Sequence, residues 1–210
     1  MTRVTLAQIS SALALPRPGL AAQARMAPRP RPGDLTPPPP EHPLKEAGVL
    51  ILLYLKEQEF YFVLTLRTLS VATHKGQISL PGGGREAGES LDTTARRETS
   101  EELGLAAERI ELLGPPLTPL YIPVSGFWVT PYVGYWDGRP EFRPEPGEVI
   151  EPIEAPLAVL LDDSYVVEEE WELRGERVCV PFFNIGGHKV WGATAMMLSE
   201  FKVLLETARA

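Results

Sequence analysis

The hydrophobic pattern changes at residue 45, after which short apolar segments alternate with polar ones. Residues 47–55 and 60–66 are rich in aliphatic and aromatic side chains, and the polar stretch Lys56–Glu59 between them predicts a β-hairpin. Further strands are predicted at 77–80, 110–113, 127–136, 151–155, 166–173 and 178–183. Helices are predicted over 90–103 and 193–208. The pattern therefore predicts an α+β fold, with helices packed on a mixed sheet.

The chain before residue 45 has a different composition. Ten of the 22 prolines lie in residues 1–43, and proline fixes φ and lacks an amide proton. We expect residues 27–43 to be an extended linker or a strap over the domain surface. Residues 5–15 predict a short helix; a signal peptide is the alternative, although polar residues interrupt its apolar part. The predicted organisation is an N-terminal helix with a proline-rich strap over 1–44, followed by one domain over 45–210.

Composition excludes several classes of protein. The formal net charge is −8, which argues against nucleic-acid binding because that binding depends on lysine and arginine at phosphates. No apolar run is long enough to span a membrane, and the single cysteine, Cys179, excludes an internal disulfide. A cytoplasmic location is expected. An acidic protein that handles phosphates needs metal cations between the two negative partners.

The segment from 83 to 105 carries the candidate chemistry. Glu98, Glu101 and Glu102 fall on one face of the predicted helix, where their like charges repel one another. A hard divalent cation, Mg²⁺ or Mn²⁺, would remove this repulsion and prefers oxygen ligands. The glycines at 82–84 allow the backbone to approach the same site. A solvated acidic helix face is the alternative interpretation.

The spacing of this segment resembles the Nudix box, G-x5-E-x7-R-E-U-x-E-E-x-G-U, where U is a bulky aliphatic residue. All of its fixed letters are present, as Gly83, Glu89, Arg97, Glu98, Glu101, Glu102 and Gly104. Thr99 departs from the pattern at the first U position. Since this is a packing position, we do not expect the departure to abolish metal binding.

The resemblance implies a Nudix fold, an α/β/α sandwich around a mixed β-sheet, and hydrolysis of a nucleoside diphosphate linked to another group. It implies a Mg²⁺ or Mn²⁺ site whose ligands are Glu98, Glu101, Glu102 and the carbonyl of Gly82 or Gly83. It also implies an ion pair between Glu89 and Arg97 that holds the loop against the helix.

Residues 63–83 resemble the additional signature of the coenzyme A pyrophosphatase branch of this family. The matching residues are Leu64, Thr65, Arg67, Gly76, Pro81, Gly82 and Gly83, and the departures are Val63, Thr68, Ala72 and Leu80. Ala72 replaces an arginine that could meet a phosphate. The predicted substrate-binding residues are Arg67, His74 and Gln77, with a salt bridge or a loop hydrogen bond as the alternative role of each.

The predicted reaction is attack of a metal-activated water on one phosphorus of a P–O–P bond, without a covalent enzyme intermediate. A glutamate acts as the base, with Glu98 in the box and Glu148 in the later loop as the candidates. For coenzyme A or its thioesters, the resemblance implies the products 3′,5′-ADP and 4′-phosphopantetheine or its acyl form. The partner is thus a small-molecule nucleotide, and a homodimer is compatible with the sequence.

Two other functions compete with this one. A Nudix hydrolase for NADH or ADP-ribose is supported by Ala72. A non-catalytic ligand sensor on the same fold would be expected to lose box glutamates, which this chain keeps.

Overall fold

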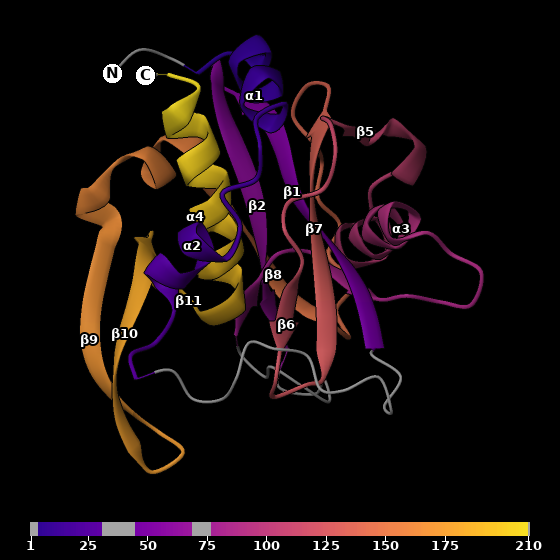
Figure 1. Cartoon of the computed structure of the whole chain (residues 1–210). Helices are drawn as coiled ribbons and strands as arrows, with labels where there is room; N and C mark the ends of the chain where they lie inside the picture. The colour runs from indigo at the N-terminus through magenta and orange to yellow at the C-terminus, as the bar shows by residue number, and fades with distance from the viewer. Residues whose placement is uncertain (1–3, 31–44, 69–76, 210) are drawn as a thin grey trace.

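A mixed eight-stranded sheet forms the centre of the computed structural model, which describes residues 4–30, 45–68 and 77–209 (Figure 1). Its central strand, β1 (Lys45–Lys56), pairs antiparallel with β2 (Glu59–Arg67) and parallel with β7 (Phe127–Trp136). The predicted hairpin is therefore confirmed.

The burial of β1 explains its central position. Residues 47–54 are all buried, so the strand is covered on both faces. Leu50 and Leu52 belong to one apolar cluster, whereas Ile51 and Leu53 belong to a larger one on the opposite face. Side chains alternate between the two faces of a strand, so an uninterrupted apolar run is typical of a strand with layers on both sides.

Shorter strands complete the central sheet. They are β3 (Ile78–Ser79), β4 (Gly82–Gly84), β5 (Glu111–Leu112), β6 (Leu120–Ile122) and β8 (Val149–Pro156). The path through the sheet is β3-β2-β1-β7-β5, while β4 also pairs with β1, β6 with β7 and β8 with β2. The pattern did not predict β4 or β6, because three glycines and a three-residue segment have no periodicity to detect.

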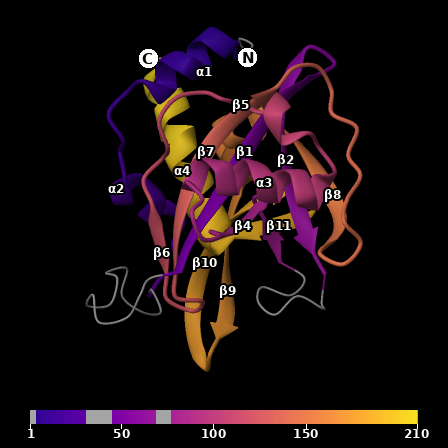
Figure 2. The ribbon, with the colours of Figure 1, turned by 90° about the vertical axis from the view of Figure 1, so that its right-hand side faces the viewer.

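Helices cover both faces of this sheet, which confirms the predicted α+β sandwich. Figure 2 shows α3 (Leu91–Leu103) in front of the sheet and α4 (Gly192–Thr207) behind it. Beyond α4 lies a second sheet of β9 (Val166–Leu173), β10 (Glu176–Ile185) and β11 (His188–Trp191), in the order β11-β10-β9. This outer layer was not predicted as a separate sheet. No helix among the described residues is long and apolar enough to cross a membrane.

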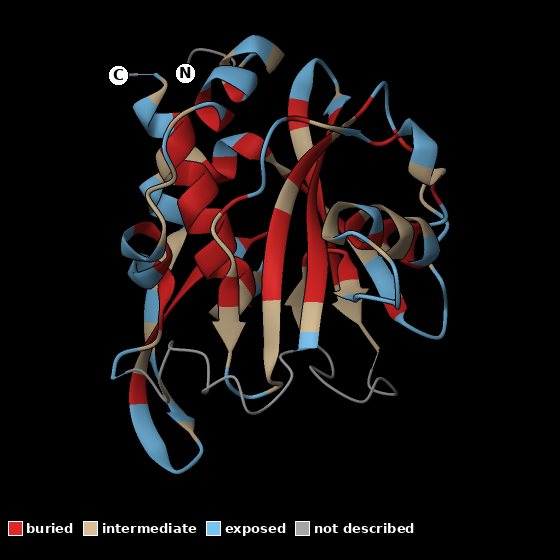
Figure 3. Cartoon of the chain, turned by 45° about the vertical axis from the view of Figure 1, so that its right-hand side comes forward, coloured by how far each residue is buried: buried red, intermediate tan, exposed pale blue. Residues whose placement is uncertain are grey.

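The N-terminal residues pack into the same core as the rest of the chain. The predicted helix is present as α1 (Leu6–Leu13), which Thr5 and Gln8 cap reciprocally, and a short α2 (Leu20–Gln23) follows. Ile9, Leu13 and Met26 are almost fully buried in the larger apolar cluster. Figure 3 shows in red the buried parts of the helices and strands. The 3₁₀ helices are Ala24–Met26, Ala107–Arg109, Leu157–Leu161 and Asp163–Tyr165.

A buried carboxylate on α4 connects the N-terminal segment to the domain. Glu200 is fully buried and accepts hydrogen bonds from the backbone N–H and hydroxyl of Thr118, the latter at 2.6 Å. Gln23 donates to it from its amide at 3.0 Å, and Gly19 donates from its backbone at 3.3 Å. Because a buried charge is costly unless it is hydrogen-bonded, these donors make the position of α4 depend on residues 19–23.

Replacing Glu200 is expected to destabilise the whole fold. Glu200→Ala leaves several buried donors without a partner and should lower the free energy of unfolding by about 3 kcal/mol, measured by urea denaturation. The control is Glu206→Ala on the same helix, since Glu206 is exposed and its partner Lys202 keeps Asp163 and a backbone carbonyl. Equal stability of the two variants would contradict this account.

Candidate active site

The helix α3 carries the predicted carboxylates and lies very close to β1. A Cβ atom on Gly48 would lie 2.3 Å from the carbonyl oxygen of Leu91 and 3.0 Å from the nitrogen of Ala95, so only glycine allows this approach. The helix ends at Gly104, whose φ of +66° is the left-handed conformation expected there. Ser90 occupies the N-cap position, but its hydroxyl bonds the Thr93 side chain and forms no capping hydrogen bond.

Thr99, the one departure from the box, is buried beneath this helix. Its hydroxyl donates to the carbonyl of Ala95 at 2.7 Å. A hydroxyl bonded to the preceding turn is satisfied without a further partner. The departure is thus accommodated within the helix itself.

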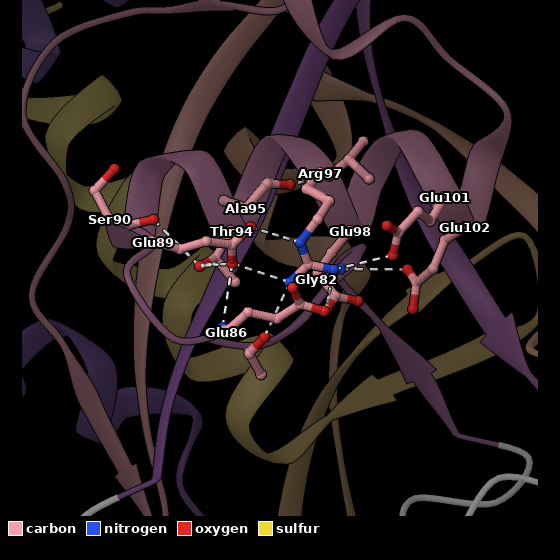
Figure 4. A network of polar contacts seen from close by, with 12 residues as sticks. Gly82, Glu86, Glu89, Ser90, Thr94, Ala95, Arg97, Glu98, Glu101 and Glu102 are labelled. Carbon is pink, nitrogen blue, oxygen red and sulfur yellow. Dashed lines mark hydrogen bonds and ion pairs between the residues drawn. The ribbon is translucent and has the colours of Figure 1, made fainter.

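Arg97 lies at the centre of a network of carboxylates (Figure 4). Its guanidinium contacts Glu89 at 2.7 and 3.1 Å, and it also donates to the carbonyl of Gly84. The hydrogen bond from Arg97 lowers the pKa of Glu89 to about 2. This pair joins the loop of residues 84–89 to the helix, as the resemblance implies.

Glu98 is held between Arg97 and the glycine strand β4. The Arg97 Nη1 atom lies 3.0 Å from Glu98 Oε1 and also 3.0 Å from Glu101 Oε2. A Cβ atom on Gly83 would lie 2.3 Å from the Glu98 carboxylate, so the absence of a side chain makes room for it. Burial raises the pKa of Glu98, and Arg97 opposes that shift.

Glu102 is the most deeply buried of the three helix carboxylates. Its exposed fraction is 1%, and it pairs with Arg67 of β2 at 2.8 Å and accepts the backbone N–H of Gly82 at 3.2 Å. Burial raises its pKa to about 7, although Arg67 opposes the shift and the nearby charges of Glu98 and Glu148 add to it. The carboxylates of α3 and of the loop before β8 are therefore close enough to influence one another.

These oxygen atoms fit a hard divalent cation in their chemistry. The described residues contain no ready-made cluster of three histidine, cysteine or acidic side chains around one point, because Arg97 and Arg67 are bound to the carboxylates. Glu101 is 60% exposed. The two guanidinium groups neutralise negative charge on the carboxylates that a metal cation could otherwise neutralise. Because Gly83 has no side chain, the Glu98 carboxylate can lie close to the backbone of β4.

The predicted substrate-binding residues have different positions. Arg67 forms the ion pair with Glu102, and Gln77 accepts a hydrogen bond from the Arg67 backbone at 3.0 Å through its carbonyl. His74 and Ala72 lie outside the described residues. The roles of Arg67, His74 and Gln77 in binding substrate remain predictions.

A family model described as the NUDIX domain matches residues 44–171. The chain belongs to the Nudix family. The Nudix match ends inside β9, so β10, β11 and α4 follow it. Nudix hydrolases act on nucleoside diphosphate derivatives and generally use divalent metals such as Mg²⁺ or Mn²⁺.

Two curated Nudix relatives have the same identity to this chain but differ in how much of their own length the match covers. An uncharacterised Nudix hydrolase, NudL, of Pectobacterium atrosepticum is 33% identical over 77% of this chain and 83% of its own length. Nudix hydrolase 15, mitochondrial, of Arabidopsis thaliana is also 33% identical, over 73% of this chain. The match spans only 56% of the plant protein.

Solved structures of Nudix proteins are also among the proteins to which the chain is similar. A MutT protein from Methanosarcina mazei is 19% identical with a TM-score of 0.49, and the alignment covers 80% of this chain and 95% of that one. An Ap4A hydrolase from Caenorhabditis elegans is 18% identical with a TM-score of 0.47, over 53% of this chain and 80% of its own.

The space beside Gly83, which the Glu98 carboxylate fills, gives a direct test of the metal site. Gly83→Ala places a Cβ against Glu98 and should weaken Mn²⁺ affinity by about 10- to 100-fold, measured by calorimetric titration. Gly84→Ala is the matched control, because its Cβ would meet only Phe127 at an ordinary 3.7 Å. Unchanged Mn²⁺ affinity in Gly83→Ala would remove Glu98 from the proposed ligands.

The Glu89–Arg97 pair predicts a dependence of stability on acid. The pKa of Glu89 is about 2 in the folded protein against an ordinary 4.5, so its contribution is fully present above pH 4.5 and is lost as the pH falls toward 2. The melting temperatures of the parent protein and Glu89→Gln should therefore differ at pH 6, differ less at pH 3 and converge only as the pH reaches about 2. A difference that stays constant over this range would refute the coupling.

Proposed function

We propose that this Nudix protein is a divalent-metal-dependent hydrolase that cleaves the pyrophosphate bond of coenzyme A or its thioesters. The products would be 3′,5′-ADP and 4′-phosphopantetheine or its acyl form. The proposal rests on one observation: Glu98 and Glu102 both contact β4, and Glu102 is paired with Arg67. The coenzyme A assignment is supported by the signature over residues 63–83, which precedes the box directly.

The proposed cation is Mg²⁺ or Mn²⁺, held by the carboxylates of Glu98, Glu101 and Glu102 and by the carbonyl of Gly82. When bound, it would neutralise phosphate charge and lower the pKa of a bound water. The protein prepares this site without it, since Arg97 orients Glu98 and Glu101, and the Gly82 amide orients Glu102. Release of Glu102 and Glu101 by their arginines would free oxygen atoms for the cation.

A carboxylate accepts the proton of the attacking water in this proposal. Glu148 is the proposed base, with Glu98 as the alternative within the box. Glu148 immediately precedes β8, and its carbonyl accepts the backbone N–H of Thr68, which ties the loop to the end of β2. The charge of Glu148 raises the pKa of both Glu98 and Glu102, so it lies on the same side of the molecule as the helix carboxylates.

A second candidate substrate class is NADH or ADP-ribose. Ala72 stands where the coenzyme A branch usually has an arginine, and the remaining arginine of that signature, Arg67, is paired with Glu102. A site with fewer unpaired arginine side chains would bind the 3′-phosphate of coenzyme A less strongly. Its preference for coenzyme A over substrates that lack this phosphate would therefore be smaller.

Substrate comparison separates these two functions. With Mg²⁺ or Mn²⁺, the kcat/KM for coenzyme A should exceed that for NADH and ADP-ribose, and chelation of the metal should abolish turnover. Product analysis in ¹⁸O-labelled water would identify the attacked phosphorus. Absence of a preference for coenzyme A would favour the second class.

Single carboxamide variants test the residue roles. Glu98→Gln and Glu102→Gln should each reduce kcat by about 100-fold or more, and Glu148→Gln by a similar factor if it is the base. Glu145→Gln is the control, because Glu145 lies in the same loop and is exposed. Full activity of Glu102→Gln would overturn the metal assignment.

A further inference from the structure

A cavity of about 590 Å³ lies beside the candidate active site, on the side of the central sheet that faces α4. Its walls come from β4, the turn between β6 and β7, the turn between β9 and β10, and the first turn of α4. Arg67 and Gly82–Gly84 line the cavity and also contact the helix carboxylates or lie against them. The cavity therefore shares lining residues with the candidate active site.

The inner wall of the cavity is apolar. It is formed by buried core residues, among them Val49, Leu120, Met196 and Met197. Thr194 donates to the carbonyl of Ile78 at 3.2 Å, which fixes the first turn of α4 against β3. A cavity of this size with an apolar interior is typical of a small-molecule site.

Charged side chains are confined to the mouth of the cavity. Of its described lining residues, Glu172 near the end of β9 and Arg174 in the turn that follows are exposed, and Arg67 is paired with Glu102. The part of the interior formed by described residues therefore offers no unpaired cation to a phosphate group. This distribution disfavours the 3′-phosphoadenosine end of coenzyme A as the occupant and favours the uncharged arm.

We propose that this cavity binds the pantetheine arm and acyl chain of the substrate, and that Leu173, at the end of β9, determines the preference for them. This inference rests on the proposed function. Leu173 and Trp191 form the apolar wall along the arm. The outer sheet, which lies mostly beyond the Nudix match, thereby sets substrate selectivity.

The test compares two substitutions to glutamate. Leu173→Glu should raise the KM for hexanoyl-coenzyme A by about tenfold or more with little change in kcat, because it places a charge along the apolar chain. Leu20→Glu is the control, since Leu20 is an exposed leucine on α2 away from the cavity lining. Circular dichroism checks that both variants keep the fold.

A binding measurement separates this inference from the proposed reaction. Calorimetry with S-hexanoyl-4′-phosphopantetheine and metal-free protein should show binding that Leu173→Glu weakens and Leu20→Glu leaves unchanged. Absence of binding, or equal affinity in all variants, would overturn the role of the cavity. Failure to hydrolyse coenzyme A while this binding persists would instead overturn the proposed reaction alone.

Discussion

Electrostatic repulsion between carboxylates on one helix is the constraint on which the rest of the site depends. Glu98, Glu101 and Glu102 lie within two turns, and their mutual repulsion would destabilise an isolated helix. Two arginines oppose it from different directions, Arg97 from the helix itself and Arg67 from the neighbouring strand β2. The sheet and the helix are thereby joined by the same charges that the proposed reaction requires.

Close backbone approach is the second requirement of this arrangement. Gly48 allows α3 to lie directly on β1, and Gly83 leaves room for the carboxylate of Glu98. A side chain at either position would separate the helix from the sheet or displace the carboxylate. The box therefore depends on steric space as much as on charge, and part of that space is provided by a residue outside the box.

Sequence reasoning found the elements whose signal is local. The β1–β2 hairpin and α3 were predictable because long apolar runs and a helical period extend over many residues. The box residues were predictable because their spacing is distinctive. The role of Gly48, the Glu102–Arg67 pair and the position of Leu173 beside the cavity depend on contacts between segments far apart in the chain, so no local pattern carries them.

The burial of the N-terminal helix has a consequence for how the molecule acquires its structure. Ile9 and Leu13 belong to the core that α4 completes, and Glu200 of that last helix binds the backbone and side chains of segments synthesised much earlier. During synthesis α1 leaves the ribosome well before α4. Residues of α1 therefore reach their buried environment only after α4 has been made, and the folding unit extends on both sides beyond the region that the family model matches.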